Sequence, residues 1–332
     1  MTLTILKLNL EIVGRSDLLM IRGKMKNKKI AITGGAGFIG SRLAHALADN
    51  NKIVIIDDLS TGNMKNIADL IGTKDVSFIQ ASITNLKLMK DALFGIDLVY
   101  HEAGVYIGDF LKTNEINITG TLNVLLAARD NNIDKVVFAS SSAVYGDTEV
   151  IPVVENMPLN PQTVYALSKL AGEEYCRIFT NVYGLKTTCL RYFNVYGPGQ
   201  SLFSPACLIP IIVSKINQNQ SPVIFGDGEQ TRDFIFVDDV VRANILAADS
   251  DNTGVFNVGT GNDRSINFLV EEIMRLMGKF LPLVYQEQRP NDIKQSRADT
   301  SKAKIFGFEA SYKLEQGLRE TLLLNNNLYD IQ

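Results

Sequence analysis

The 332-residue sequence predicts an α/β protein with a doubly wound parallel sheet and a smaller C-terminal α/β lobe. Two observations support this fold class. From residue 28 to about residue 190, short β-branched runs alternate with longer helical segments, as in a sheet that helices cover on both faces. After residue 191 the elements are shorter and Pro and Gly interrupt them often, which is typical of binding loops on a rigid sheet.

The expected strands are apolar runs that end in small or polar residues, namely KIAITG, KIVIID, VSFIQA, LVYHEA, KVVFAS and KTTCLRY. Helical segments such as SRLAHALADN and GTLNVLLAARDNN separate them. This alternation predicts one parallel sheet, because each helical crossover returns the chain in the same direction. We expect a first domain over residues 25–190 and a second lobe over residues 191–325, from which a segment such as VFNVG returns to the main sheet.

The first 24 residues precede the clear patterning, which begins at KKIAITGG just after Met25. We expect residues 1–24 to be an extension or a misread start, and an ordered strand built on LTILKLNLEIV is the alternative. Glu11, Arg15 and Asp17 interrupt the apolar pieces of this segment. A signal peptide needs a continuous apolar core, so none is predicted.

The composition excludes several classes of function. A net charge of −3 provides no basic surface for nucleic acid or anionic lipid. No apolar run approaches the roughly 18 residues of a membrane-spanning helix. The chain has only three cysteines and two histidines, too few and too scattered for a disulfide framework or a cysteine-rich metal site. We therefore expect a cytoplasmic protein with no nucleic-acid, membrane or metal partner.

The segment AITGGAGFIGS joins the first expected strand to the first expected helix. Gly35, Gly37 and Gly40 match G-x-G-x-x-G, and Gly34 gives a second spacing, G-x-x-G-x-x-G. Such glycines let the backbone approach a pyrophosphate, whose charge the helix N-terminus stabilises. Asp57 ends the next strand, twenty residues after Gly37, where a carboxylate binds ribose hydroxyls and repels a 2′-phosphate. The segment therefore predicts an NAD site rather than an NADP site.

Two further segments carry candidate chemistry. In VYALSKLAGEEYCR, Tyr165 and Lys169 stand at i and i+4 on one helical face, where an ammonium is expected to lower the pKa of the phenol. Ser140, Ser141 and Ser142 stand at the C-terminal end of the strand KVVFAS, at the sheet edge where parallel sheets bind ligands. Solvated turn serines and a chance surface pair are the structural alternatives. Together with the glycine loop, the two segments predict a hydride-transfer site.

The chain resembles the nucleotide-sugar epimerases of the extended short-chain dehydrogenase/reductase family. The resemblance covers nearly all of residues 28–320 and rests on TGGAGFIG, HEAG, NITGT, SSSAVYG, YALSK, RYFNVYGP, GDGEQTRDFIFVDD and RPND. It implies a Rossmann domain that binds NAD and a smaller lobe that binds a nucleotide sugar. It also implies a homodimer, formed through helices near residues 112–130 and 163–180.

The resemblance assigns roles position by position. Tyr165 would be the catalytic acid/base, Lys169 its partner and an NAD-ribose ligand, and Ser141 the hydroxyl that positions substrate. The implied cofactor-binding residues also include Gly34, Gly37, Phe38, Ile39, Gly40, Asp57, Asp58, Ser60, Thr61, Gly62, Ser82, Ile83, Ala103, Asn117 and Phe193. The implied substrate-binding residues are Asn194, Leu208, Val223, Phe225, Arg232, Arg289, Asp292 and Ser296.

Some of these positions have a more specific implied role. Ala103, Asn117 and Phe193 would line the nicotinamide side of the cofactor. The resemblance implies diphosphate ligands at Asn194, Arg232 and Arg289, uracil packing at Phe225 and a ribose ligand at Asp292. Two arginines suit a diphosphate, because their planar guanidinium groups match its oxygens. The chain departs from the family pattern at Ser82, where an acid commonly contacts adenine, and at Glu102, which replaces a more usual apolar residue.

The reaction is predicted from an absence at the serine turn. Related dehydratases and decarboxylases carry an acid just before Val-Tyr-Gly, whereas Ser142 and Ala143 cannot ionise. The resemblance therefore implies 4-epimerisation of a UDP-hexose, such as UDP-glucose and UDP-galactose, through a transient 4-keto sugar. Another nucleotide-sugar oxidoreductase, dehydratase or decarboxylase and a non-catalytic NAD sensor are the alternatives. Ser296 stands where a large tyrosine excludes 2-N-acetyl groups, so N-acetylated UDP-sugars are also candidate substrates.

Overall fold

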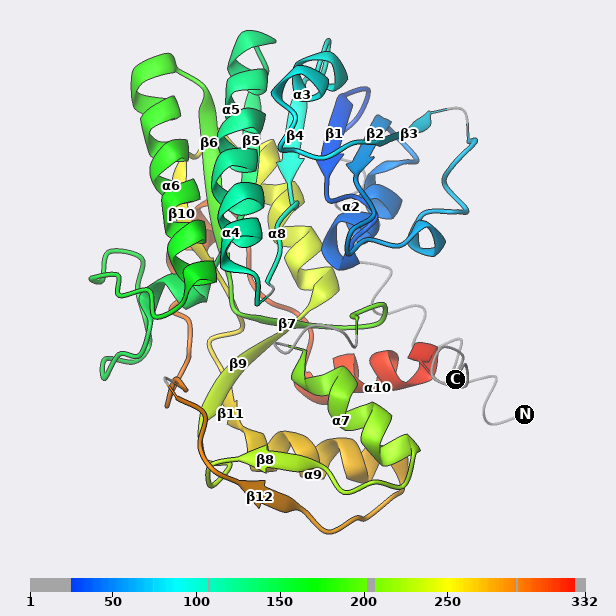
Figure 1. Cartoon of the computed structure of the whole chain (residues 1–332), viewed down its shortest axis with the longest axis vertical. Coiled ribbons are helices and arrows are strands. Elements are labelled where there is room, and N and C mark those ends of the chain that lie inside the picture. Colours follow the sequence, from blue (N-terminus) through cyan, green and yellow to red (C-terminus); the bar gives the residue numbers. More distant parts are fainter. Residues whose placement is uncertain (1–24, 74, 107, 202–206, 291, 326–332) are drawn as a thin grey trace.

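The structure is a computed structural model that describes residues 25–73, 75–106, 108–201, 207–290 and 292–325 (Figure 1). The expectation for residues 1–24 lies outside the described residues. Two lobes are visible, a larger one built on a central sheet and a smaller one beneath it. The site described below lies where they meet, at the carboxyl ends of the large sheet's strands.

Seven parallel strands form the central sheet, which confirms the predicted fold class. Their spatial order is β3 (Val76–Gln80), β2 (Lys52–Asp57), β1 (Lys29–Thr33), β4 (Leu98–His101), β5 (Lys135–Ser141), β6 (Lys186–Tyr192) and β10 (Gly254–Val258). The first six coincide with the apolar runs of the sequence, because strands buried on both faces need apolar residues at nearly every position. Strand β10 contains the first four residues of VFNVG and pairs with β6 at the edge of the sheet.

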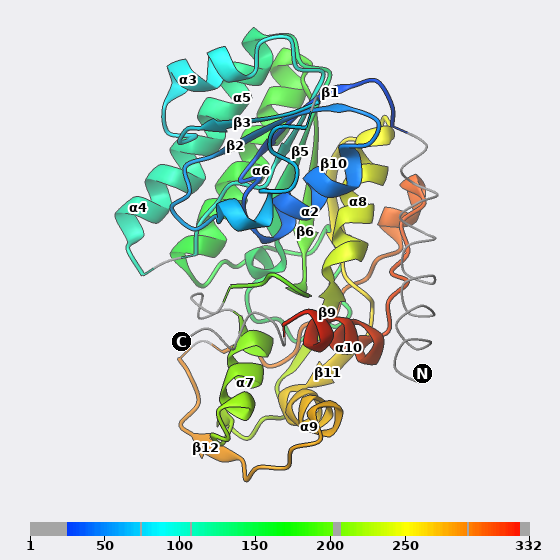
Figure 2. The same cartoon turned by 90° about the vertical axis from the view of Figure 1, so that its right-hand side faces the viewer.

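Helices cover both faces of the sheet (Figure 2). On one face lie α3 (Leu86–Ala92), α4 (Phe110–Asn114), α5 (Thr121–Asp130) and α6 (Val164–Tyr183), and on the other lie α2 (Phe38–Leu47) and α8 (Val237–Asp249). A π-helical turn, η2 (Glu115–Gly120), joins α4 to α5. Alternate strand residues supply the two cores, since Ile30 and Ile32 of β1 pack toward α2 and α8 whereas Ala31 packs toward α5 and α6.

The described part of the smaller lobe has two short sheets and three helices. The sheets comprise β11 (Asp263–Ser265), β9 (Thr231–Phe236) and β7 (Asn194–Tyr196) in one, and β12 (Val284–Gln286) and β8 (Val223–Phe225) in the other. The helices are α7 (Leu208–Asn217), α9 (Ile266–Met277) and α10 (Leu314–Asn325). Ile212, Phe234 and Leu269 are buried in its separate apolar core. Because α8 and β10 return to the large sheet, the chain crosses between the lobes more than once.

Three short 3-10 turns complete the secondary structure of the described chain: η1 (Met64–Asn66), η3 (Ser142–Tyr145) and η4 (Lys302–Phe306). Within the described ranges, no helix is both long and apolar enough to cross a membrane. The His, Cys, Asp and Glu side chains of the same ranges form no group of three that could bind a metal ion.

Candidate active site

The glycine loop forms one wall of a pocket at the carboxyl edge of the sheet. After β1 the chain turns through Gly34, whose φ of +68° lies in the left-handed region that glycine favours. Gly40, in the first turn of α2, packs so closely that an added Cβ atom would overlap the carbonyl oxygen of Gly34. The loop is therefore a cradle that side chains would fill, and the N-terminus of α2 opens onto it. Such a helix end stabilises a phosphate charge.

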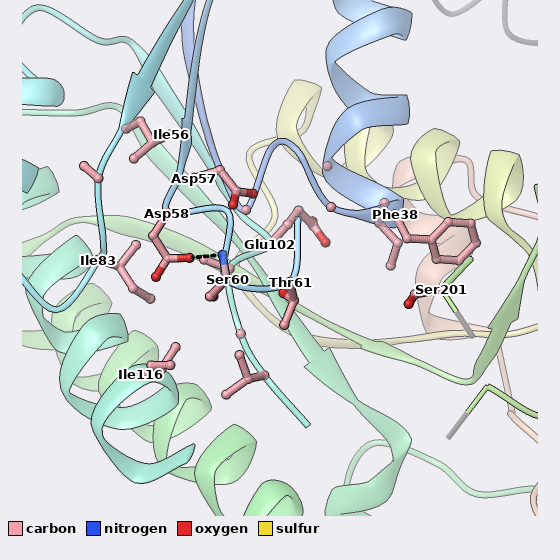
Figure 3. Close-up of a pocket in the computed structure, with 18 of the residues that line it drawn as sticks. Phe38, Ile56, Asp57, Asp58, Ser60, Thr61, Ile83, Glu102, Ile116 and Ser201 are labelled. Atoms are coloured by element: carbon pink, nitrogen blue, oxygen red, sulfur yellow. Dashed lines mark hydrogen bonds between the residues drawn. The ribbon is translucent and has the colours of Figure 1, made fainter. Parts of the chain in front are cut away.

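Two neighbouring carboxylates at the end of β2 lie in different surroundings. Asp57 is buried and accepts hydrogen bonds from the N–H groups of Ala36, at 3.0 Å, and Leu59, at 2.8 Å. Burial raises the pKa of Asp57, and these two bonds oppose the rise. Asp58 is more exposed and accepts from the N–H of Ser60 at 2.9 Å (Figure 3). Asp57 thus braces the glycine loop while Asp58 forms the rim of the pocket.

The pocket collects most of the residues predicted to bind the cofactor (Figure 3). Those that line it are Gly34, Gly37, Phe38, Ile39, Gly40, Asp57, Asp58, Ser60, Thr61, Ile83 and Ala103. A tight glycine cradle, a helix N-terminus and a nearby carboxylate rim are the groups that a dinucleotide requires. The residues present therefore fit NAD, with the diphosphate on the loop and the adenosine ribose near Asp57 and Asp58.

Several residues that line the cofactor pocket were not predicted from the sequence. They are Ile56, Ala81, Glu102, Gly104, Val105, Ile116, Gln200, Ser201 and Cys207. Ala81 and Gly104 follow the carboxyl ends of β3 and β4, so their strand positions could have identified them. Gln200, Ser201 and Cys207 come from the segment that leads into the smaller lobe, and only the packing of the two lobes brings them to the cofactor pocket.

Four predicted cofactor residues lie beside the pocket rather than on its wall. Gly62 packs on Asp57, because an added Cβ atom would lie 2.7 Å from a carboxylate oxygen. Ser82 stands between two lining residues, and its hydroxyl lies 3.0 Å from that of Thr84. Asn117 holds the backbone of Val105 through two hydrogen bonds of 2.8 and 2.9 Å. These three residues therefore support the pocket without lining it.

Phe193 is the fourth of these residues. It is buried in an apolar cluster with Val144, Tyr145, Val153 and Ala298, behind the serine turn. The sequence assigned it to the nicotinamide side through resemblance alone. In this structure its ring supports the turn that carries Ser141 instead of lining the pocket around the glycine loop.

The structure brings Ser141, Tyr165 and Lys169 together. Ser141 ends β5, and its hydroxyl accepts from the N–H of Ala143 at 3.2 Å, which begins the turn η3. The hydroxyl also bonds to the phenol of Tyr165 on α6. One turn later on α6, Lys169 donates from Nζ to the carbonyl of Ala139 at 2.8 Å. Strand β5 thus positions all three groups.

The titration of this trio differs from the expectation. Burial raises the pKa of the Tyr165 phenol, and the hydrogen bond from Ser141 opposes that rise. The prediction that Lys169 lowers the pKa of Tyr165 is therefore wrong. Nζ of Lys169 lies 5.8 Å from the centre of the Tyr165 ring. Its ammonium group donates a hydrogen bond to the carbonyl of Ala139 instead of to the phenol. Burial in turn lowers the pKa of Lys169 to about 8.

A buried ion pair supports the serine turn from below. Arg191 of β6 donates to both carboxylate oxygens of Glu173 on α6, at 2.9 and 2.7 Å. Ser140 donates to the same carboxylate at 2.5 Å. The guanidinium of Arg191 also lies 4.7 Å from the centre of the Tyr145 ring. Ser140 therefore has a structural role, as the strand-end position predicted for it, while its neighbour Ser141 faces Tyr165.

Four of the predicted substrate residues form a cluster in the smaller lobe. Arg232 donates to Asp292 at 2.5 Å and to the carbonyl of Ile293 at 2.6 Å. The guanidinium of Arg289 lies over the ring of Phe225, 4.1 Å from its centre. A planar cation over an aromatic face is a favourable contact. Both arginines therefore have internal partners that a diphosphate would have to replace or share.

The other predicted substrate residues are more dispersed. Asn194 begins β7 and donates to the carbonyl of Asp233 at 3.4 Å. Val223 begins β8, and Leu208 begins α7 next to Cys207 of the cofactor pocket. The segment that carries Ser296 runs beside the loop after the serine turn, because Lys294 bonds to Asp147 and Arg297 bonds to Val153. Ser296 thus lies on an irregular segment beside that loop, two residues before the isolated bridge between Ala298 and Val153.

Three known proteins are similar to this chain over most of its length. A UDP-N-acetylglucosamine 4-epimerase structure from Methanobrevibacter ruminantium is 40% identical, with a TM-score of 0.88 over 92% of this chain and 100% of that one. The UDP-glucose 4-epimerase of Mycolicibacterium smegmatis is 34% identical over 88% of this chain and 96% of that protein. UDP-glucuronic acid decarboxylase 1 of Xenopus tropicalis is 30% identical over 89% of this chain and 71% of that protein.

The relatives therefore share a scaffold and differ in reaction and sugar. The sequence model described as the NAD dependent epimerase/dehydratase family matches residues 30–259, which include β1, the glycine loop, the serine turn and β10. That match, the NAD-compatible cradle and the Ser141, Tyr165 and Lys169 trio agree with one another. The chain belongs to the NAD-dependent epimerase/dehydratase family.

Proposed function

We propose that this enzyme catalyses the 4-epimerisation of a UDP-hexose through a transient 4-keto sugar. The observation that carries the proposal is the trio at the end of β5, in which Ser141 bonds to Tyr165 and no acid stands at Ser142 or Ala143. The relatives named as 4-epimerases support the same reaction. Tyr165 and Ser141 together can move a proton to and from one sugar hydroxyl.

The residues of the chain have separate roles in this reaction. Tyr165, as its phenolate, removes the proton of the sugar 4-hydroxyl, and Ser141 holds the same oxygen by a hydrogen bond. Lys169 provides positive charge at the base of the site. NAD bound on the glycine loop would supply the acceptor for the C4 hydride and its return. Tyr165 then gives its proton back to the oxygen, and the product differs from the substrate only in configuration at C4.

The turn η3 explains why the reaction would end at this point. A dehydratase must remove water from the keto sugar, and a decarboxylase must remove CO₂, so both need further groups near the serine turn. Ser142 and Ala143 occupy the first two positions of η3, and neither side chain can transfer a proton near neutral pH. The 4-keto sugar is therefore expected to react only by the return of hydride to C4.

Product analysis tests this proposal. The enzyme with NAD would be incubated separately with UDP-glucose, UDP-N-acetylglucosamine and UDP-glucuronate, and the sugars separated by chromatography. We expect the 4-epimer of at least one substrate, with no net formation of reduced cofactor. A dehydrated 4-keto-6-deoxy sugar or a decarboxylated pentose as the main product would overturn it, and no conversion with bound NAD would favour a sensor.

The sugar itself is a finer proposal. We infer that Ser296 leaves room for a 2-N-acetyl group, because its short, partly buried side chain lies on the segment beside the serine turn. Ser296→Tyr is expected to reduce turnover of UDP-N-acetylglucosamine about tenfold or more, as the loss of about 1.4 kcal/mol of binding would. Turnover of UDP-glucose is the control and should change little. Equal effects on both sugars would show that residue 296 does not select the sugar.

We also propose that the protein is a homodimer. Large apolar side chains are exposed on α4 and α6, which lie side by side on one outer face of the large lobe (Figures 1 and 2). They are Phe110, Leu111, Leu167, Ile178, Val182 and Tyr183. Exposed apolar side chains gathered on neighbouring helices are characteristic of a protein interface. Light scattering coupled to gel filtration should give twice the 36.7 kDa mass of one chain, and a monomer at micromolar concentration would overturn the proposal.

A further inference from the structure

Glu102 is a carboxylate in the cofactor pocket that the reaction above does not use. It follows β4 in the HEAG segment and lines the pocket around the glycine loop (Figure 3). Burial raises its pKa to about 7, and the neighbouring Tyr192 and Lys169 oppose the rise. A partly buried carboxylate is costly unless its surroundings stabilise the charged form, so its contacts identify what it does.

Glu102 belongs to a hydrogen-bond network with Tyr192 and Asn244. Asn244 of α8 donates from Nδ2 to the hydroxyl oxygen of Tyr192 at 2.7 Å and also to the carbonyl of Val240. The hydroxyl of Tyr192 lies 2.9 Å from Oε1 of Glu102 and 3.0 Å from Oδ1 of Asn244, and the carboxylate is the stronger acceptor of its single proton. Burial and the adjacent carboxylate keep the pKa of Tyr192 well above its usual value, so this hydroxyl stays a donor. The side chain of Glu102 is thus fixed in place by groups from two other elements.

Lys169 is the cation close to the segment that carries Glu102. Its ammonium group is buried, and a Cβ atom added at Gly104, two residues after Glu102, would lie 3.0 Å from Nζ. Glu102 is the group that raises the pKa of Lys169, against the lowering caused by burial. The carbonyl of Ala139 accepts one of its protons but supplies no charge. Removing the carboxylate would leave a buried ammonium with a hydrogen bond and no counter-charge.

The other titratable groups nearby do not replace Glu102. His101 stays neutral at working pH, because burial and Lys169 lower its pKa to about 3. Tyr100 and Tyr192 have pKa values raised through burial, and neither supplies a negative charge near pH 7. Tyr106 packs edge-on against Tyr165 with ring centres 5.0 Å apart. Glu102 is consequently the carboxylate that acts on Lys169 in the described structure.

We propose that Glu102 is a positioning residue that keeps the Lys169 ammonium charged beside Tyr165 and so determines the alkaline limit of the hydride-transfer site. Below the pKa of Glu102, about 7, the carboxyl group gains a proton, and above the pKa of Lys169, about 8, the ammonium loses one. Both groups are charged in the interval between. The inference rests on the proposed function only in taking Lys169 to support Tyr165.

The direct test measures the charge of Lys169 in the NAD-bound protein. Lysine labelled with ¹³C at Cε would be titrated by NMR, with the signal of residue 169 assigned from its loss in Lys169→Met. Glu102→Gln keeps an oxygen that can accept from Tyr192 and removes only the charge. The midpoint of Lys169 should fall by about one pH unit, the lower end of the effect of an adjacent opposite charge. A change below about 0.3 unit, well within ordinary pKa scatter, would overturn the inference.

Two further variants make the test specific. Asp58→Asn removes a carboxylate from the rim of the same pocket and should leave the Lys169 midpoint unchanged. If Glu102→Gln does not fold, Tyr192→Phe removes the bond that lowers the pKa of Glu102, and it should shift Lys169 in the same direction by less. An unchanged midpoint in Tyr192→Phe would then refute the inference.

Activity provides the second readout. In Glu102→Gln the alkaline limb of the pH–turnover profile should move down by the same amount as the Lys169 midpoint, while the loss at acid pH that comes from Glu102 should disappear. A shifted midpoint with no epimerisation at any pH would refute the proposed function and leave the link between Glu102 and Lys169 standing. A shifted midpoint with an unchanged pH profile would refute the catalytic part of the inference.

Discussion

The cofactor side and the substrate side of the cleft are built differently. On the cofactor side, Asp57 bonds to two backbone N–H groups and Gly40 packs against Gly34, so the cradle has its shape within the large sheet. On the substrate side, β12 is exposed along its length and Arg232 is paired with Asp292. The cofactor pocket is therefore preformed, whereas a nucleotide sugar bound at the proposed substrate site would replace internal contacts of the protein.

This difference has a functional consequence. An enzyme that returns its hydride to the same sugar keeps one cofactor through many cycles, while sugar must enter and leave in each. A rigid cradle suits the first requirement, because no ordering cost is incurred when the cofactor binds. Arginines with replaceable partners suit the second, because the loss of their internal partners offsets part of the binding free energy of the sugar nucleotide. The predictions below test whether the two sides differ in this way.

The largest expected effect concerns the ion pair beneath the serine turn. Glu173 and Arg191 are each 3% exposed, whereas Arg232 and Asp292 are 15% and 17% exposed. Glu173→Gln should lower the free energy of unfolding by about 3 kcal/mol, because it leaves a buried guanidinium without its counter-charge. Asp292→Asn should lower it by about 1 kcal/mol or less. Chemical denaturation followed by circular dichroism would measure the free energy of unfolding of each variant. Equal decreases in the two variants would contradict the proposed difference between the two ion pairs.

Next in size is the loss of the catalytic phenol. Tyr165→Phe removes the hydroxyl that bonds to Ser141 and is expected to lower turnover at least about 100-fold, the lower end of acid/base contributions. The cofactor side should be unaffected, so NAD affinity measured by calorimetry should stay within a factor of about two, below 0.5 kcal/mol. Near-normal turnover would show that Tyr165 is not the acid/base.

The smallest expected effect tests how rigid the cradle is. Gly40→Ala places a methyl group against the backbone of Gly34, which has no flexible side chain to move aside. NAD affinity should fall about tenfold, equivalent to about 1.4 kcal/mol, as the loop opens to admit the methyl group. Gly108→Ala is the matched control, since no atom of the described residues lies within 4 Å of its added Cβ atom. If Gly40→Ala keeps its full affinity for NAD, the cradle is less preformed than its packing indicates.

Much of the large lobe could be predicted from the sequence, and the reason is local. Strands β1, β2, β4 and β5 are buried on both faces along most of their length, so each appears as a nearly continuous apolar run. The Gly34–Gly40 spacing describes a turn within seven consecutive residues. Tyr165 and Lys169 share a helical turn, so their proximity also follows from spacing.

Other features depend on residues that are far apart in the chain. The partner of Glu102 is 90 residues away, and that partner's own donor, Asn244, is a further 52 residues away. The sequence identified Glu102 as unusual and gave no reason for it, because nothing local surrounds it. The raised pKa of Tyr165 has the same origin, since burial is a property of the assembled site.

The sequence by itself determined the sheet, the glycine cradle for NAD and the Tyr165 and Lys169 pair, because strand burial, tight turns and helical spacing act over a few residues. Only the tertiary structure decided that Asp57 braces the loop, that Phe193 supports the serine turn and that Glu102 acts on Lys169. Charge, burial and hydrogen bonding depend on which distant segments pack together. The presence of the site could therefore be predicted from the sequence. The hydrogen bonds and pKa shifts that determine its chemistry could be found only from the tertiary structure.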